Sequence, residues 1–168
     1  MEDKSTLVSE RVTFTPLRRE DFEEILAMYD EPDTAKYILP LQNKDQAFYL
    51  NFLEGKIASN KSLVGFWTVR NSADNTFIGT ANLNKFQHRD ITHVGCHLSR
   101  EFWGQGFGFE VMNFLKNYGV EQRGMPEVYG LVQEGHNASK HLMMKMGFKL
   151  IEQIHLEVPL NIFRFRQD

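Results

Sequence analysis

The apolar residues of this chain change their spacing several times, and each change marks the boundary of an expected element. In residues 11–17, apolar and polar residues alternate until Pro16, which is typical of an edge strand that ends there. Residues 19–30 and 43–59 instead place apolar side chains at helical spacing, the first with acidic residues in its opening turn. The apolar face of the second helix is expected to consist of Ala47, Leu50, Leu53 and Ile57.

Extended and helical segments alternate through the rest of the chain. Three extended runs separated by turn-rich segments predict an antiparallel meander over residues 63–70, 76–86 and 92–98. The later segments are predicted as helix 107–123, strand 128–133, helix 136–146, and strands 148–156 and 160–166. This order predicts an α/β protein with a mixed, mostly antiparallel sheet of about six or seven strands and helices on both faces.

Composition narrows the class of protein. The chain has 168 residues, of which 42% are apolar, so we expect one domain that spans residues 1–168 and buries a substantial core. Its lone cysteine, Cys96, has no partner for an internal disulfide, and the first residues do not pair a basic stretch with an apolar run, so a cytoplasmic protein is expected. A formal net charge of −3 without a Lys/Arg cluster argues against a nucleic-acid partner, and no apolar run reaches the roughly 20 residues of a membrane span.

The most informative segment is a glycine-rich turn, Gly104-Gln105-Gly106-Phe107-Gly108, between an expected strand and an expected helix. The first turn of a helix presents unpaired N–H groups and the positive end of the helix dipole, and glycine lets a pyrophosphate approach them closely. The alternative is a connector chosen only for its backbone angles. Neither a dinucleotide fingerprint nor a P-loop fits, because Phe109 stands where the former needs glycine and no lysine follows these glycines.

This turn, with Trp103 before it and Glu110 after it, resembles the signature of the GNAT acyltransferases, in particular their RimJ/RimL-like branch. The resemblance extends over about residues 9–166 and includes the opening R-x-x-F-x-P-L, residues 77–80, and the segment 137–148, in family order. It implies a GNAT fold with a splayed cofactor-binding cleft, acetyl-CoA as the co-substrate, and a primary amine as the acceptor. That branch acetylates protein α-amino groups and related small amines.

The resemblance also implies where acetyl-CoA binds. Its pyrophosphate is expected on the N–H groups of 104–108, and its pantetheine beside the strand at 96–98. The residues agree with this, since a β-bulge or a gap beside Gly95 leaves backbone groups free for an extended guest chain. The expected cofactor-binding residues are Cys96, His97, Leu98, Trp103, Gly104, Gln105, Gly106, Phe107, Gly108 and Asn137.

The catalytic assignments rest mainly on the same resemblance. Many GNAT enzymes carry a proton-donating Tyr where this chain has Met143, whereas the RimJ/RimL-like branch has a Ser one turn earlier, which is Ser139 here. Ser139 is therefore expected to act on the departing thiolate, although it also suits a plain first-turn position. The Asn that usually precedes this Ser by three residues is replaced by His136, with Asn137 one place later, and either residue is a candidate for its role.

The base that removes the amine proton is less clearly marked. His93 and His97 lie on one face of a predicted strand, and His97 is nearer the expected acetyl group. A packed histidine or a water chain is the alternative. With one cysteine and no paired histidines at helical spacing, no metal site is expected.

The acceptor is expected to enter near the first two helices. The available aromatic residues there are Tyr37, Phe48, Tyr49 and Phe52, and the nearby acidic residues are Glu31 and Asp33. A protein N-terminus is the expected acceptor, with a small amine such as an amino acid, a polyamine or an antibiotic as the alternative. A non-catalytic acyl-CoA-binding module is a third hypothesis. The sequence leaves a monomer and a homodimer equally open.

Overall fold

A single eight-stranded sheet organises the protein, seen in a computed structural model that describes residues 6–34, 36–38, 41–60 and 65–167. Its strands are β1 (Leu7–Val8), β2 (Val12–Pro16), β3 (Gly65–Asn71), β4 (Phe77–Lys85), β5 (Thr92–Leu98), β6 (Glu127–Gln133), β7 (Lys149–His155) and β8 (Pro159–Arg166). They lie in the order β1-β2-β3-β4-β5-β6-β8-β7, and only the β5–β6 pair is parallel. The expected mixed, mostly antiparallel sheet is therefore confirmed.

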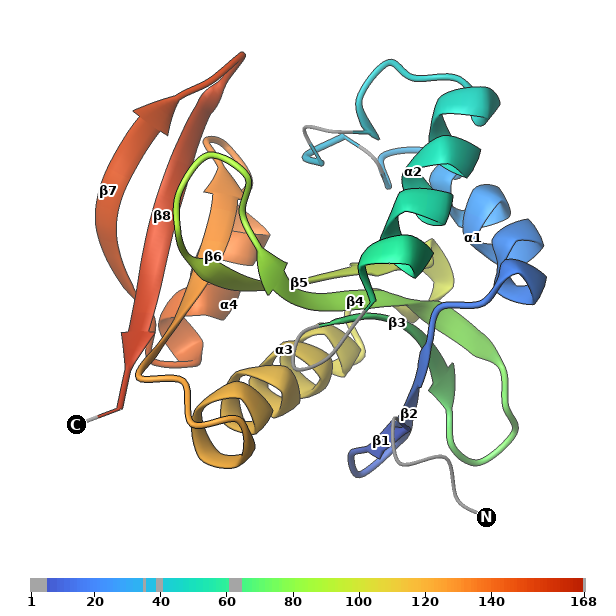
Figure 1. Cartoon of the computed structure of the whole chain (residues 1–168), viewed down its shortest axis with the longest axis horizontal. Coiled ribbons are helices and arrows are strands. Elements are labelled where there is room, and N and C mark those ends of the chain that lie inside the picture. The colour runs from blue at the N-terminus through green and yellow to red at the C-terminus, as the bar shows by residue number, and fades with distance from the viewer. Residues whose placement is uncertain (1–5, 35, 39–40, 61–64, 168) are drawn as a thin grey trace.

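Helices cover both faces of this sheet. The helices are α1 (Phe22–Tyr29), α2 (Gln46–Ser59), α3 (Phe107–Asn117) and α4 (Asn137–Lys145). Helices α1 and α2 lie above the central strands in Figure 1 and α3 lies below them. The core divides accordingly, because Phe66 of β3 packs with α1 and α2 while its neighbour Trp67 packs with α3 on the opposite face. Among the described residues, no helix is both long and apolar enough to cross a bilayer.

The sheet splits between β5 and β6. These strands pair only at His93↔Tyr129 and Val94↔Gly130, after which β5 continues with β4 and β6 continues with β8. The two groups of strands diverge visibly from this point (Figure 1). The predicted gap beside Gly95 is confirmed, but it involves no bulge in β5, whose register with β4 runs without a shift from Lys85↔Thr92 to Gly79↔Leu98.

The N-terminal edge of the sheet differs from the prediction. Leu7 and Val8 form the short strand β1, which pairs with β2, so β2 is not an edge strand and the sheet has eight strands rather than six or seven. A two-residue strand is too short to show a period of its own, and its pairing with β2 is a tertiary contact. The end of β2 at Pro16 is as predicted.

Helix α2 presents a different face from the one predicted. Its buried residues are Tyr49 and Leu53, whereas Leu50 is 38% exposed and Ala47 is also exposed. The physical reason is aromatic packing, because the Tyr49 ring lies against the Tyr29 ring of α1 at a centroid distance of 5.1 Å. The helix is rotated toward α1 to bury Tyr49 and leaves smaller apolar residues in solvent.

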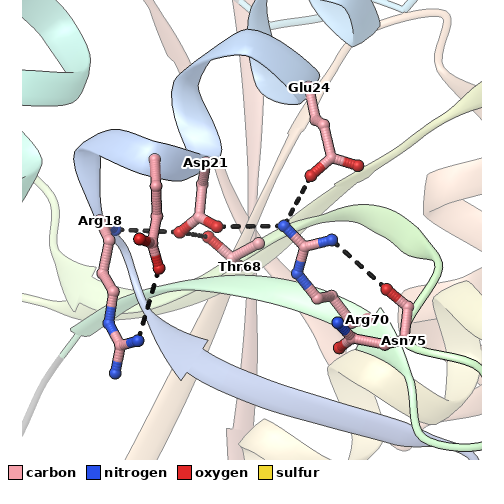
Figure 2. Close-up of polar contacts among 7 residues, drawn as sticks. Arg18, Asp21, Glu24, Thr68, Arg70 and Asn75 are labelled. Atoms are coloured by element: carbon pink, nitrogen blue, oxygen red, sulfur yellow. Dashed lines mark hydrogen bonds and ion pairs between the residues drawn. The ribbon is translucent and has the colours of Figure 1, made fainter.

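A buried carboxylate fixes the beginning of α1 on the sheet (Figure 2). Asp21 accepts hydrogen bonds from the Arg18 backbone N–H (3.0 Å), the Thr68 hydroxyl (2.8 Å) and the Arg70 guanidinium (3.1 Å). Arg70 also pairs with Glu24 one turn into the helix. A buried carboxylate is tolerated only with such partners, and here they fix the start of α1 to β3.

Candidate active site

The glycine-rich turn leads directly into α3. Gly104 and Gly106 have φ angles of +73° and +83°, and Gly106 is the N-cap residue of the helix. No side chain caps this terminus, so the first N–H groups of α3 are available to an anion. A Cβ at Gly104 would meet nothing within 4 Å, and one at Gly106 would meet only Arg11 at 3.5 Å. The turn thus combines left-handed backbone with a surface free of side chains.

Arg11 is a cation beside this turn that the sequence analysis did not single out. Its guanidinium lies 4.0 Å from the centre of the Phe107 ring, donates to the Gln105 carbonyl at 3.3 Å, and pairs with Glu110 at 2.7 Å. Burial alone raises the pKa of Glu110, but hydrogen bonds from Ser9 and Arg11 outweigh it and hold that pKa below its usual range. The only sequence signal for Arg11 was its place in the opening motif.

The open edge of β5 provides the second backbone feature. The Ser99 N–H donates to the Ile78 carbonyl of β4. Since backbone N–H and C=O groups of successive strand residues point in opposite directions, those of the odd-numbered β5 residues face β4 and those of Cys96 and Leu98 face the gap. The Trp103 indole donates to the Leu98 carbonyl at 2.8 Å. The strands described here provide no partner for the N–H and C=O of Cys96 or for the N–H of Leu98. An extended amide chain can pair with such an edge as an added strand.

The side chains of Cys96 and Leu98 point away from this chemistry. Both pack against the core on the α3 side of the sheet. Burial raises the pKa of the Cys96 thiol to about 12, so the thiol is protonated at neutral pH and is not a nucleophile. The contribution of these residues to a site is therefore made through their backbone.

Helix α4 carries the predicted Ser139 on the other side of the split. Ser139 is the third residue of the helix and is partly exposed. His136 is the N-cap residue, and its ring stacks on Tyr37 at a centroid distance of 4.3 Å, whereas Asn137 is exposed. Met143 lies in the core against Gly130 of β6 and provides no hydroxyl.

A cavity of about 350 Å³ lies among the end of α1, the segment that follows it and the start of α2. Tyr29, Glu31, Asp33, Lys36 and Tyr49 are among the residues that line it. The Glu31 carboxylate is already engaged, because it accepts hydrogen bonds from the Ser99 hydroxyl (2.5 Å) and the Arg100 N–H (2.7 Å). These bonds tie the cavity wall to the segment that leads into the glycine-rich turn.

The aromatic residues predicted to line an entrance are only partly brought together. Tyr49 lines the cavity, but Tyr37 stacks on His136 and Phe52 packs edge-on against Phe66. Phe48 is 37% exposed and lies beneath Lys44. Their spacing in the sequence did not show which of them face the cavity.

Tyr29, in the expected helix 19–30, is a cavity residue that the sequence did not mark as part of the site. It is 4% exposed, its hydroxyl is buried without a hydrogen-bond partner, and its ring lies edge-on to His97 at 6.4 Å. Burial, with a smaller contribution from Tyr49, raises the pKa of Tyr29 and keeps the hydroxyl protonated. A buried hydroxyl without a partner is costly, which favours a bound partner in the working enzyme.

His93 and His97 lie on one face of β5, as predicted. Burial lowers the pKa of each ring to about 4, and the positive charge of Lys56 contributes to both shifts. The Nδ1 atom of each ring is buried without a partner. Both rings are therefore neutral at pH 7 and are weak bases. No group of three potential metal-ligating residues occurs in the described parts of the chain.

A family model described as "Acetyltransferase (GNAT) domain" matches residues 11–149, which includes the split in the sheet, the glycine-rich turn and α4. The chain belongs to the GNAT acetyltransferase family. It is accordingly an acetyl-CoA-dependent N-acetyltransferase. The expectation of a GNAT fold is confirmed.

Known relatives agree on the family and differ in what they act on. An uncharacterized N-acetyltransferase p20 of Bacillus licheniformis is 24% identical over 147 residues, which is 86% of this chain and 82% of the relative. Among solved structures, the ribosomal L7/L12 α-N-protein acetyltransferase RimL in complex with coenzyme A has a TM-score of 0.79 at 13% identity and covers 95% of this chain and 96% of its own. The spermidine N-acetyltransferase of Vibrio cholerae in complex with CoA and spermine has a TM-score of 0.77 at 17% identity. The match covers 95% of this chain and 97% of that one. Likeness at this identity shows a shared fold, and the substrate class of this GNAT enzyme is open.

The residues of this GNAT enzyme fit acetyl-CoA. The bare, left-handed turn at 104–106 suits a pyrophosphate, with the Arg11 cation beside it. The unpartnered edge of β5 at 96–98 suits the amides of pantetheine. The fit rests on backbone geometry. The glycines that allow this geometry could be recognised in the sequence.

Proposed function

We propose that this enzyme acetylates α-amino groups, with the N-terminus of a protein or peptide as its acceptor. The observation that carries the proposal is the setting of the two histidines nearest the split: the Nδ1 atom of each ring is buried without a partner among the described residues, and this burial lowers both pKa values. An unperturbed α-amino group has a pKa of about 7.7–8.0, so roughly a tenth of it is already neutral at pH 7, whereas a lysine-like amine with a pKa of about 10.4 is almost wholly protonated. A site with weak bases suits the acceptor that needs least help to lose its proton.

The charges of the cavity support the same acceptor. A polyamine carries several positive charges and needs several free carboxylates, but Glu31 is held by Ser99 and Arg100, and Asp33 shares the wall with Lys36. The volume of about 350 Å³ suits the first residue or two of a peptide. RimL, which has the same fold, is named as an α-N-protein acetyltransferase.

Each proposed role uses a residue at the split. Acetyl-CoA supplies the acetyl group as a thioester. The N–H groups of 104–108 bind its pyrophosphate, the backbone groups of Cys96 that face the gap bind its pantetheine, and the Leu98 N–H polarises the acetyl carbonyl, whereas the His97 backbone pairs with β4. Trp103 fixes the Leu98 carbonyl, and Asn137 contributes a polar contact at the start of α4. The Ser139 hydroxyl donates to the departing sulfur, and His97 or a water molecule takes the amine proton.

A free amino acid is the second candidate acceptor. The reason is the same, because its α-amino group also loses a proton far more readily than an alkylamine does. A peptide differs from it by presenting a neutral amide in place of the α-carboxylate.

The test follows free thiol released from acetyl-CoA over a panel of peptides, amino acids, spermidine and lysine side-chain amines, each across pH 5–9. For a peptide, kcat/KM is expected to rise about tenfold per pH unit and to level off near the α-amino pKa of about 8. Neither histidine is expected to add a sloping segment to the plot of kcat/KM against pH in this range, since a ring with a pKa of about 4 is neutral throughout.

A matched peptide with an acetylated N-terminus is the control and should release no thiol. Preferred turnover of spermidine or of lysine side chains would contradict the proposal. A limb near pH 6.5 that does not move with the acceptor's pKa would contradict the assignment of weak bases.

A further inference from the structure

A strip of polar side chains lines the sheet beneath α2, on the same face as His97. The strand register places Asn82 of β4 between Phe66 of β3 and Gly95 of β5. The Asn82 side chain lies across Gly95, since a Cβ at Gly95 would be 2.8 Å from its Oδ1 atom. His97 and His93 lie two residues to either side of Gly95 on this face.

Lys56 extends from α2 over the β3 end of this strip. Its ammonium lies 5.1 Å from the centre of the Phe52 ring and 5.9 Å from that of Phe66, which begins the row that contains Asn82 and Gly95. Lys56 is partly buried, and its charge acts on both His93 and His97. The ammonium therefore lies at the Phe66 end of this row, and its charge reaches both imidazoles.

This positive charge has no carboxylate partner. None of the ion pairs among the described residues involves Lys56. Desolvation by burial lowers the pKa of Lys56, and no neighbouring acid opposes that shift. A half-buried ammonium that contacts aromatic rings and has no ion pair among the described residues is incompletely satisfied. The partner that would satisfy the Lys56 ammonium is a group that carries negative charge and accepts hydrogen bonds.

We propose that Lys56 binds a carboxylate of the acceptor, so that the enzyme prefers amines on molecules that also carry a carboxylate. This inference rests on the proposed α-amino function and names the recognition element of the same site. His97 adjoins Leu98, the residue that faces the acetyl position, and His93 lies about 13 Å further along β5 at roughly 3.3 Å per residue. The carboxylate bound at Lys56 is thus within about 13 Å of the reacting amine, a distance that an extended peptide covers in about four residues.

Two sources carry such a carboxylate. One is an Asp or Glu side chain in the first residues of a peptide, and the other is the α-carboxylate of a free amino acid. Two comparisons separate these sources. The first compares peptides that carry an acidic side chain at residue 2 or 3 with peptides that carry the corresponding amide. The second compares amino acids with their amides. The preference for the acidic member should appear in one series and identify the source.

The experiment crosses the type of amine with the presence of a carboxylate and measures kcat/KM by thiol release. The α-amine arm uses Ser-Asp and Ser-Asn peptides with amidated C-termini, together with an amino acid and its amide. The side-chain arm uses Nα-acetyl-lysine and its amide. The wild-type enzyme is expected to prefer the acidic member of a pair about tenfold, as for one partly exposed charged hydrogen bond.

Lys56→Met keeps the apolar contact with Phe52 and Phe66 and removes the charge. It should abolish the tenfold preference by lowering kcat/KM for the acidic acceptor only. Lys44→Met is the matched control, because Lys44 lies 5.2 Å from the Phe48 ring near the start of α2 but is exposed and away from the strip. Lys56→Arg should retain most of the preference.

The outcomes separate this inference from the proposed function. Equal turnover of acidic and amide acceptors by the wild type overturns the carboxylate site, even if Lys56→Met does not fold. A preference that survives in Lys56→Met also overturns it. Acidic preference confined to the lysine arm would support the carboxylate site and contradict the α-amino proposal, whereas absence of turnover in both arms would overturn both.

Discussion

The two halves of the proposed active site are made of different parts of the polypeptide. The cofactor half consists mainly of backbone, at the glycine-rich turn and at the unpartnered edge of β5. The acceptor half consists of side chains that α1, α2 and β5 bring to one cavity and one sheet face, including Tyr29, Lys56 and His97. The first half requires the absence of side chains and the second requires particular ones.

This difference has an energetic consequence. A backbone N–H cannot be removed by substitution, so the cofactor half is damaged only when a new side chain blocks the approach of the ligand or distorts the turn. The acceptor half loses one hydrogen bond or one charge with each truncated side chain. Substitutions should therefore have large, uniform effects in the first half and small, acceptor-specific effects in the second.

The largest effect is expected for Gly106→Val. A branched side chain at φ +83° strains the turn and covers N–H groups that bind pyrophosphate, so affinity for acetyl-CoA should fall by about 100-fold or more, as for the loss of one or two charged hydrogen bonds. Calorimetric titration with CoA measures it.

Gly124→Val is the matched control. Gly124 has a similar φ of +68° and open space around it, but it lies beyond the end of α3, far along the chain from the turn. It should lose stability to the same strain and keep its affinity for CoA. An equal loss of affinity in both variants would show that strain, and not the blocked turn, accounts for the effect.

A smaller effect is expected for Ser139→Ala, the single side chain that the cofactor half is proposed to use in chemistry. Loss of the hydroxyl should lower kcat about tenfold and leave the affinity for acetyl-CoA within about twofold, because a hydrogen bond to the departing sulfur acts mainly in the transition state. Ser72→Ala, in the exposed turn before β4, is the control. An unchanged kcat would remove Ser139 from the mechanism.

The fold was predictable where the pattern of the chain is local. Strand β5 was predicted to the residue, and Gly147 ends α4 in the left-handed region as its sequence indicated. Strand β1 was not predicted, because its two residues are too few to show a period, and the buried face of α2 was not, because it depends on packing against Tyr29 of α1. Local periodicity does not contain that information.

The same distinction holds for the site. The glycine-rich turn is contiguous, so five neighbouring residues were enough to propose a role for its backbone. Arg11 reaches Glu110 across 99 positions, and Lys56 lies over a row that joins β3, β4 and β5. Nothing in the sequence around Lys56 indicates that its charge is unpaired. The acceptor half is therefore known only from the folded chain.

The smallest effect, and the one that most sharpens the comparison, is expected for Tyr29→Phe. Removal of a buried hydroxyl without a partner should raise the free energy of unfolding by about 1 kcal/mol. Loss of one hydrogen bond to the acceptor should raise the KM for the acceptor about fivefold and leave the affinity for CoA unchanged. Chemical denaturation and steady-state kinetics on the same sample measure the two changes.

Tyr49→Phe is the control, because the Tyr49 hydroxyl donates to the Leu41 carbonyl at 3.0 Å and its loss should destabilise the protein. A less stable Tyr29→Phe enzyme would mean that the hydroxyl serves the fold, and an unchanged acceptor KM would mean that it does not face the acceptor.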